Sequence, residues 1–290
     1  MCRLSGTTRP RLSREVLVTG IGYQGEPGAY SEQAVRVLFP DAEAIPIRTL
    51  RRVFEAVESG ELEHGLVPLE NSLAGSINET YDLLSAGKAF MVGEVVVPID
   101  HALLALPGTR TEDVRRVCSH PQALAQCEEF LAMLDTELVP VYDTAGAAKR
   151  IAEEGRGGEA AVASENAASI YGLEVLARHI QTSSQNQTRF AAIAPKLEPL
   201  APANKTSLLL EIKHEPGSLF RCLKAFAERD LNLSKLESRP IADRPWEYWF
   251  YLDVQAGVGD RALADALSDL EGEAGRVQVV GSYARAEGPI

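Results

Sequence analysis

The stretch GLVPLENSLAGS, residues 65–76, shows how this chain is built. Residues 65–67 are apolar and indicate a short buried strand. The polar residues Glu70, Asn71 and Ser72 follow, then Gly75, and a helical pattern runs from residue 77 to residue 85. A strand that ends in polar residues and leads into a helix is the unit from which α/β proteins are built.

The same alternation of strand and helix continues through most of the chain. Residues 16–23, 91–98, 114–119, 160–163 and 190–194 are expected to form further strands. Residues 30–39, 50–59, 123–134, 145–154 and 165–171 are expected to form further helices. This order predicts an α/β domain with mostly parallel strands. In such sheets ligands bind at the carboxyl ends of the strands, where helix N-termini point.

A proline-rich stretch divides the chain near residue 200. Pro195, Pro199 and Pro202 stand within eight residues, and proline suits neither a helix interior nor an inner strand, so we interpret residues 196–204 as a linker. Beyond it, expected strands at 206–213, 233–240, 248–255 and 277–283 alternate with helices at 218–229 and 261–271. The order βαββαβ predicts a ferredoxin-like arrangement. We therefore expect a tail at 1–15, a first domain at 16–195 and a second domain at 205–285.

Composition and charge exclude several classes of protein. The 290 residues carry 41 acidic and 29 basic side chains, a net charge of −12, which argues against nucleic acid as the main partner. No run approaches the ~20 apolar residues of a membrane span, and the arginine-rich residues 1–14 lead into no apolar segment. We therefore expect no membrane association and a disordered N-terminal tail, with a short organelle-targeting peptide as the alternative for that tail. Cys2, Cys118, Cys127 and Cys222 lack metal-binding spacing, which favours a reducing cytoplasm. The sequence shows no phosphate loop, dinucleotide motif or metal cluster, so we expect chemistry without a cofactor.

Polar residues at the predicted strand ends are candidates for a binding site. Asn71 and Ser72 can donate hydrogen bonds to an anion, and Glu70 can orient them or act as an acid. Thr144 can cap the helix at 145–154 and aim free N–H groups at a carboxylate. Helix capping alone is the alternative explanation of these residues.

Two further strand ends carry residues of the same kind. Ser119 ends the strand 114–119, and Gln122 and Gln126, four residues apart, share a helix face that suits substrate recognition. Thr188 and Arg189 stand at the mouth of the apolar strand 190–194, and arginine suits bidentate recognition of a carboxylate. A structural ion pair between Arg189 and an acidic neighbour is the alternative.

Together these sequences resemble the prephenate dehydratase family. The segments that carry the resemblance are GEPGAYSE at 25–32, PLENS at 68–72, SHPQAL at 119–124, DTAGAA at 143–148 and TRF at 188–190. After the linker, PGSL at 216–219 and ESRP at 237–240 resemble the phenylalanine-binding ACT domain of that family. The resemblance spans roughly residues 16–283 and suggests a member of the bacterial type.

The resemblance implies an architecture and an activity. The first domain would consist of two α/β lobes, like a type II periplasmic binding protein, with the active site in the cleft between them. The chain would cross between the lobes near Pro98 and again near residues 173–181. The enzyme, a carbon–oxygen lyase, would convert prephenate to phenylpyruvate in L-phenylalanine biosynthesis. L-Phenylalanine would bind the ACT domain at a dimer interface and inhibit, which implies a homodimer or a dimer of dimers.

The resemblance also assigns roles to individual residues. Thr188 would act at the departing hydroxyl, Arg189 would hold a substrate carboxylate, and Glu70 is the second candidate for the proton source. The expected substrate-binding residues are Asn71, Ser72, Ser119, Gln122, Gln126, Thr144, Arg189 and Phe190. The expected effector-binding residues are Gly217, Ser218, Leu219, Asn232, Leu233, Ser234, Glu237 and Ser238.

Two other functions remain open at this stage. Arogenate differs from prephenate by an amine in place of the side-chain keto group, and the segment 143–148 resembles plant-type members as well as bacterial ones, so an arogenate dehydratase is the close alternative. A non-catalytic amino-acid sensor is the distant one. Ser218 and Ser234 stand where the family often has Ala and Thr, which leaves the effector affinity open.

Overall fold

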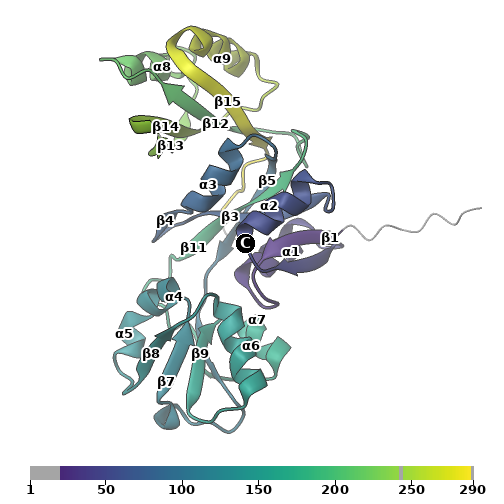
Figure 1. The fold of residues 1–290 in the computed structure, drawn as a ribbon, viewed down its shortest axis with the longest axis vertical. Helices are drawn as coiled ribbons and strands as arrows, with labels where there is room; N and C mark the ends of the chain where they lie inside the picture. The colour runs from purple at the N-terminus through teal and green to yellow at the C-terminus, as the bar shows by residue number, and fades with distance from the viewer. Residues whose placement is uncertain (1–19, 242–243, 289–290) are drawn as a thin grey trace, which may run out of the picture.

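The computed structural model describes residues 20–241 and 244–288, and it shows three bodies along the long axis of the molecule (Figure 1). Two lobes form from residues 20–194, and a C-terminal unit forms from residues 205–283. The expected tail at 1–15 lies outside the described residues. Among the helices that the structure describes, none is long and apolar enough to cross a membrane.

The first lobe is built on a mixed sheet with the strand order β5-β11-β3-β1-β2. Its strands are β1 (Gly20–Gln24), β2 (Glu43–Ile47), β3 (His64–Asn71), β5 (Phe90–Pro98) and β11 (Gln187–Ala194), with the two-residue β4 (Gly75–Ser76) at the side of β3. The helices are α1 (Tyr30–Leu38), α2 (Leu50–Glu58) and α3 (Asn78–Ser85). β1 runs parallel to β2 and β3, whereas β11 runs antiparallel to β3 and β5.

The second lobe has its own sheet, with the order β10-β6-β9-β7-β8. Its strands are β6 (Ala102–Ala105), β7 (Arg116–Ser119), β8 (Glu137–Pro140), β9 (Glu159–Ala163) and β10 (Glu174–Ala177). The helices are η1 (Thr111–Asp113), α4 (Pro121–Gln126), α5 (Glu128–Leu131), α6 (Thr144–Glu154) and α7 (Glu165–Tyr171). The chain enters this lobe through residues 99–101 and leaves it through residues 178–186, close to the two expected crossings.

The expectation of mostly parallel strands is wrong, because both sheets are mixed: β11, β6 and β10 all pair in the antiparallel sense. The sequence also failed to indicate β2, β6, β8 and β10. β2, β8 and β10 are edge strands with partly exposed side chains, so no continuous apolar run marks them. The helix expected at 123–134 is divided into α4 and α5 around Cys127.

The C-terminal unit has the expected order βαββαβ. It comprises β12 (Lys205–Ile212), α8 (Ser218–Ala227), β13 (Leu233–Ile241), β14 (Arg244–Val254), α9 (Arg261–Glu273) and β15 (Ala274–Tyr283). The strands pair antiparallel in the order β13-β14-β12-β15, and both helices pack on one face through a core that includes Phe226 and Leu263. Residues 195–204 contain no helix or strand.

One contact joins the C-terminal unit to the first lobe within a single sheet. Gly281 of β15 pairs in parallel with Met91 of β5, so that the two sheets form one ten-stranded sheet. A Cβ atom at position 281 would lie 2.5 Å from the Met91 Cβ and 2.7 Å from its carbonyl oxygen. Only glycine permits this approach of the two strands. The sequence break near residue 200 is therefore not a break in the sheet.

Candidate active site

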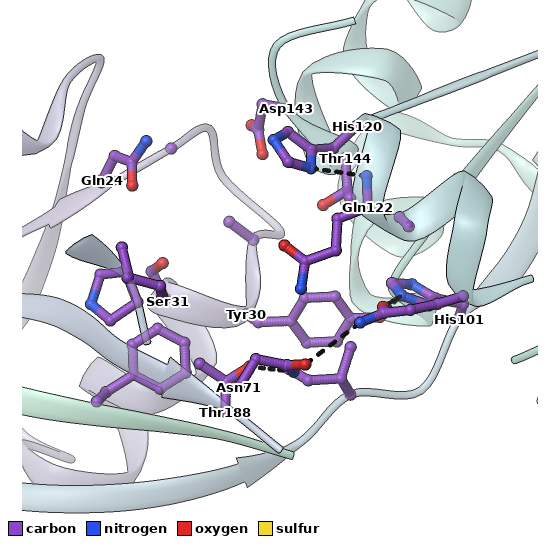
Figure 2. A pocket seen from close by; sticks show the side chains of 18 of the residues that line it. Gln24, Tyr30, Ser31, Asn71, His101, His120, Gln122, Asp143, Thr144 and Thr188 are labelled. Carbon is purple, nitrogen blue, oxygen red and sulfur yellow. Dashed lines mark hydrogen bonds between the residues drawn. The ribbon is translucent and has the colours of Figure 1, made fainter. Parts of the chain in front are cut away.

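A cavity of about 210 Å³ lies between the two lobes (Figure 2). It opens where β1, β3 and β7 end and where α1, α4 and α6 begin. The polar residues that line it are Gln24, Tyr30, Ser31, Asn71, His101, His120, Gln122, Gln126, Tyr142, Asp143, Thr144 and Thr188. This is the position in which α/β proteins bind ligands.

Asn71, the last residue of β3, organises the floor of the cavity. Its Oδ1 accepts hydrogen bonds from the backbone N–H groups of Leu73 and Ala74, both at 3.0 Å. Its Nδ2 faces three acceptors: the Asn186 Oδ1 at 2.7 Å, and the Thr188 Oγ1 and the Gln187 carbonyl oxygen at 3.0 Å each. The Thr188 oxygen therefore accepts a hydrogen bond from Asn71, which leaves the hydroxyl proton available to a molecule in the cavity.

The second lobe supplies the opposite wall. The Gln126 Nε2 lies 3.4 Å from the Asn71 Oδ1, and this contact bridges the lobes. The Nδ1 of His120 accepts the backbone N–H of Gln122 at 3.2 Å and caps α4. Figure 2 shows the Gln122 side chain reaching into the space between Thr144 and Asn71. Amide groups from both lobes thus face the same space.

The electrostatics of the cavity are unusual for an anion site. Within the described part of the chain, its lining contains neither lysine nor arginine, and it contains one carboxylate, Asp143. Burial raises the pKa of Asp143, and hydrogen bonds from the backbone N–H groups of Glu26 and Gly146 partly offset that rise. Amide donors, hydroxyls and the N-termini of α1 and α6 are therefore the groups that can hold a carboxylate here.

The structure corrects the expected roles of Arg189 and Glu70. Thr188 lies on one face of β11 and Arg189 on the other, because successive side chains of a strand point to opposite faces. The Arg189 guanidinium lies 2.7 Å from the Asp253 carboxylate and 3.1 Å from those of Glu70 and Glu94. Arg189 therefore cannot hold a substrate carboxylate, and Glu70, turned away with it, is no proton source for the cavity.

Ser72 and Ser119 also lie outside the cavity lining. The Ser72 hydroxyl donates to the carbonyl of Gln185 at 2.8 Å and fastens the loop after β3 to the segment before β11. Ser119 is fully buried and donates to the carbonyl of Val162 at 2.6 Å, which ties β7 to β9. Both serines have structural partners in place of a ligand. Asn71, Gln122, Gln126, Thr144, Thr188 and Phe190 are the expected site residues that the cavity brings together.

The expected effector residues do not converge within one chain. Ser218 and Leu219 line a cavity of about 140 Å³ that β14 completes with residues such as Trp246 and Phe250. Gly217, with φ of 81°, caps α8. On β13 and just before it, Asn232, Ser234 and Ser238 are exposed and Leu233 is half-buried. Glu237 points to the opposite face, where it pairs with Lys235 at 2.8 Å and with Ser76.

Seven polar residues of the cavity lining were not chosen as site residues from the sequence: Gln24, Tyr30, Ser31, His101, His120, Tyr142 and Asp143. Tyr30 and Asp143 lie inside segments that the sequence analysis singled out, but neither was chosen as a site residue. His101 lies in the crossing between the lobes, between β5 and β6. Its only signal in the sequence is its place three residues after the expected strand 91–98.

The sequence comparisons agree with the geometry of this cleft. Residues 21–198 match the family model described as prephenate dehydratase. The chain belongs to the prephenate dehydratase family. Arogenate dehydratase/prephenate dehydratase 2 of Arabidopsis thaliana, a protein named as chloroplastic, is 45% identical over 91% of this chain and 72% of its own length.

Two solved structures match this chain over more than 90% of its length. Prephenate dehydratase from Arthrobacter aurescens in complex with L-Phe is 31% identical, with a TM-score of 0.84 over 93% of this chain and 92% of that one. A protein described as a novel type of quorum-quenching acylase, GqqA, is 34% identical, with a TM-score of 0.84 over 92% and 98% of the two chains. The sequence is thus more similar to the plant relative than to these structures, so the expected bacterial type is not shown.

Proposed function

We propose that this chain is a dehydratase that converts prephenate to phenylpyruvate in phenylalanine biosynthesis. The observation that carries the proposal is the position of Thr188, whose hydroxyl faces the cavity while Asn71 donates to its oxygen at 3.0 Å. Membership of the prephenate dehydratase family supports the same reaction.

The reaction requires a proton donor and a firm hold on the ring. The C–O bond of the ring hydroxyl breaks, and the oxygen leaves as water after it gains a proton. The bond between the ring and its carboxylate breaks at the same time or afterwards, CO2 leaves, and the electron pair of that bond completes the aromatic ring. One proton is consumed, and phenylpyruvate, water and CO2 are formed.

Thr188 is suited to the hydroxyl end of this reaction. With its oxygen engaged by Asn71, its proton can be donated to the departing oxygen, and a donor placed there is worth about 10²–10⁴ in rate. Because a threonine hydroxyl has no accessible acidic pKa, Thr188 polarises the leaving group and relays a proton without holding a charge. Aromatisation supplies the driving force.

The carboxylates of the substrate would be held by neutral donors. The N–H groups of Gln122 and Gln126 face the cavity from α4, and the N-terminus of α6 begins at Thr144. A site without a lysine or arginine binds a dianion less tightly. It also favours decarboxylation, because a fixed cation would stabilise the carboxylate that the reaction must remove.

Arogenate is the second candidate substrate, and two observations favour it. The Arabidopsis relative is named for both activities. The one carboxylate in the cavity lining, Asp143, offers a partner to the ammonium group that arogenate carries and prephenate lacks.

The cavity gives less support to an acylase activity like that in the description of one structural relative. Acyl transfer to a side chain needs a hydroxyl or thiol beside a general base. The partner of the Thr188 hydroxyl is an amide group of Asn71, which cannot accept its proton. A pure amino-acid sensor would not need the Thr188 hydroxyl in its cavity, and this hydroxyl therefore favours an enzyme over a sensor.

The C-terminal unit is proposed to be an ACT regulatory domain that binds L-phenylalanine, as a homodimer or dimer of dimers. Support comes from the βαββαβ order and from the relative solved with L-Phe. Since Ser218 and the exposed face of β13 do not meet in one chain, a second copy would complete the effector site. The cytoplasmic location stays a prediction, because the Arabidopsis relative is named as chloroplastic.

The deciding experiment is turnover of prephenate and arogenate side by side at neutral pH, with and without L-phenylalanine. Faster prephenate turnover that L-phenylalanine suppresses is the expected result. Faster arogenate turnover would keep the mechanism and change the substrate. If neither substrate is turned over and calorimetry still detects binding of L-phenylalanine, the result would support a sensor and not an enzyme.

A further inference from the structure

A line of hydrogen bonds leads from Thr188 across the cleft to the crossing between the lobes. Asn71 contacts Gln126, Gln126 contacts His101, and His101 contacts Tyr30. His101 lies in the crossing at 99–101, is 2% exposed and lines the cavity. Tyr30 begins α1 of the first lobe, whereas Gln126 ends α4 of the second.

The backbone N–H groups around this line determine which end of each amide side chain is the oxygen and which is the NH2 group. The oxygen and nitrogen of an amide side chain can exchange places by a half-turn, but a backbone N–H can only donate. Two backbone N–H groups, of Leu73 and Ala74, point at one atom of the Asn71 amide, each at 3.0 Å. That atom must be the oxygen, so the orientation of Asn71 is fixed.

The orientation of Gln126 follows from that of Asn71. The Gln126 atom that lies 3.4 Å from the Asn71 oxygen must be the NH2 group, because two carbonyl oxygens would repel. The Gln126 oxygen then faces the Nε2 of His101 at 3.0 Å. Since an oxygen can only accept, the Nε2 of His101 must carry a proton.

The other ring nitrogen of His101 is then left to accept. The Tyr30 Oη donates to the carbonyl oxygen of Asp100 at 2.5 Å and lies 3.1 Å from the His101 Nδ1. The two rings meet edge to face, with centroids 5.6 Å apart. Burial lowers the pKa of His101, while Gln126 and Asp100 oppose this only in part, and the neutral ring is therefore favoured at neutral pH.

We propose that His101, as the neutral tautomer with its proton on Nε2, is a positioning residue that turns the N–H groups of Gln126 toward Asn71 and the cavity. This inference rests on the proposed function for its effect on turnover, but the tautomer itself does not. In the opposite tautomer His101 would attract the NH2 group of Gln126, and without His101 only the 3.4 Å contact with Asn71 would hold the amide, so that Gln126 could present its oxygen to a bound carboxylate.

The direction of this one amide matters because the cavity has no cationic side chain in its described lining. An N–H donor that faces a carboxylate attracts it, and a carbonyl oxygen in the same place repels it. A hydrogen bond to a charged group is worth about 10- to 100-fold in affinity. We therefore expect the loss of His101 to raise KM about 10- to 100-fold and to change kcat much less.

Three variants and one control test the effect on turnover with whichever substrate the wild type prefers. His101→Leu removes the donor, and His101→Gln replaces it with an amide N–H of similar reach. Tyr30→Phe removes the partner of the Nδ1 and should raise KM by about 2- to 10-fold. His64→Leu changes a half-buried histidine outside this cavity and should leave KM unchanged. An unchanged KM in a folded His101→Leu variant, or no rescue by His101→Gln relative to it, would overturn the proposal.

The tautomer can be measured without any substrate. Two-bond ¹⁵N–¹H correlation spectra of the ¹⁵N-histidine-labelled protein distinguish protonated from unprotonated ring nitrogens, and the spectrum of His101→Gln identifies the signal among the five histidines. We expect a protonated Nε2 and an unprotonated Nδ1 at neutral pH. A protonated Nδ1 would refute the inference even if turnover confirms the enzyme. Should neither substrate react, the proposed function fails, while this spectrum still decides the tautomer.

Discussion

The guanidinium of Arg189 lies 2.7 Å from the carboxylate of Asp253, and this ion pair joins β11 of the first lobe to β14 of the C-terminal unit. Lys205 and Glu94 complete a cluster in which all four side chains are at most 10% exposed. Thr188 directly precedes Arg189, so one peptide unit separates the candidate catalytic hydroxyl from a buried contact with the C-terminal unit. The cluster thereby connects the cavity to the part of the chain proposed to bind L-phenylalanine.

Replacing Arg189 with methionine should destabilise the protein strongly. The change leaves the carboxylates of Asp253 and Glu94 with less compensation in a buried site, and breaking a buried ion pair from one side costs about 3–5 kcal/mol. The free energy of unfolding in urea measures the loss. Arg52→Met is the matched control, because its pair with Glu61 is exposed and should contribute at most about 1 kcal/mol. Equal losses in the two variants would contradict the role given to the cluster.

Asp253 should make the fold sensitive to acid. Burial alone would raise its pKa, but the positive charges of Arg189 and Lys205 outweigh burial and hold the pKa below its ordinary value. An unfolded aspartate titrates near pH ~4. The stabilisation by Asp253 is therefore fully present above that pH and is lost as the pH falls toward the lower pKa of the folded state.

Unfolding in urea between about pH 5 and pH 3 measures this loss. Asp253→Asn should lower stability at neutral pH and flatten its decline in acid. Glu198→Gln, a change at an exposed carboxylate, should leave the decline as it is in the wild type. An unaltered decline in Asp253→Asn would show that other carboxylates cause the acid sensitivity.

The hydroxyl of Thr188 should be needed for rate more than for binding. Thr188→Val keeps the shape of the side chain and removes the hydroxyl, so kcat should fall about 10²–10⁴-fold with little change in melting temperature. Thr188→Ser keeps a hydroxyl and should retain most of the rate. Steady-state kinetics of the three proteins with the preferred substrate decide the matter. Near-normal turnover by Thr188→Val would remove Thr188 from the mechanism.

Glu70 provides the contrasting case. Its carboxylate faces Lys235 at 2.6 Å and Arg189 at 3.1 Å, away from the cavity. Burial would raise its pKa, but these two cations outweigh burial and keep the pKa below its ordinary value, so the group is ionised and no acid at neutral pH. Glu70→Gln should keep kcat within about tenfold of the wild type, less than the loss of a general acid would cost. A fall in kcat as large as that of Thr188→Val would reinstate Glu70 as the proton source.

The sequence predicted site residues well where a local pattern marks them, and poorly where their role depends on contacts between segments that are distant in the chain. Thr188 and Asn71 could be chosen because polar residues at strand ends are conspicuous. The sequence also indicates where Arg189 lies, because successive side chains of a strand point to opposite faces of the sheet and Arg189 follows Thr188. Alternation cannot show that Asp253, which is 64 residues away in the chain, lies on that opposite face and pairs with Arg189. His101 was missed because its role depends on contacts with both lobes.

The ion pair between Arg189 and Asp253 should also transmit the effect of L-phenylalanine. If the effector shifts the C-terminal unit between two arrangements, its influence on Thr188 needs a contact that differs between them, and the coupling is then reciprocal. Asp253→Asn keeps the shape of the side chain and removes the charge. L-Phenylalanine should still bind this variant, measured by calorimetry, but should inhibit turnover less. Asp82→Asn is the control, because the Asp82–Arg239 pair joins the same two parts of the molecule at an exposed position. Inhibition that weakens equally in both variants would show that the effect passes through the interface as a whole and not through the buried pair beside Thr188.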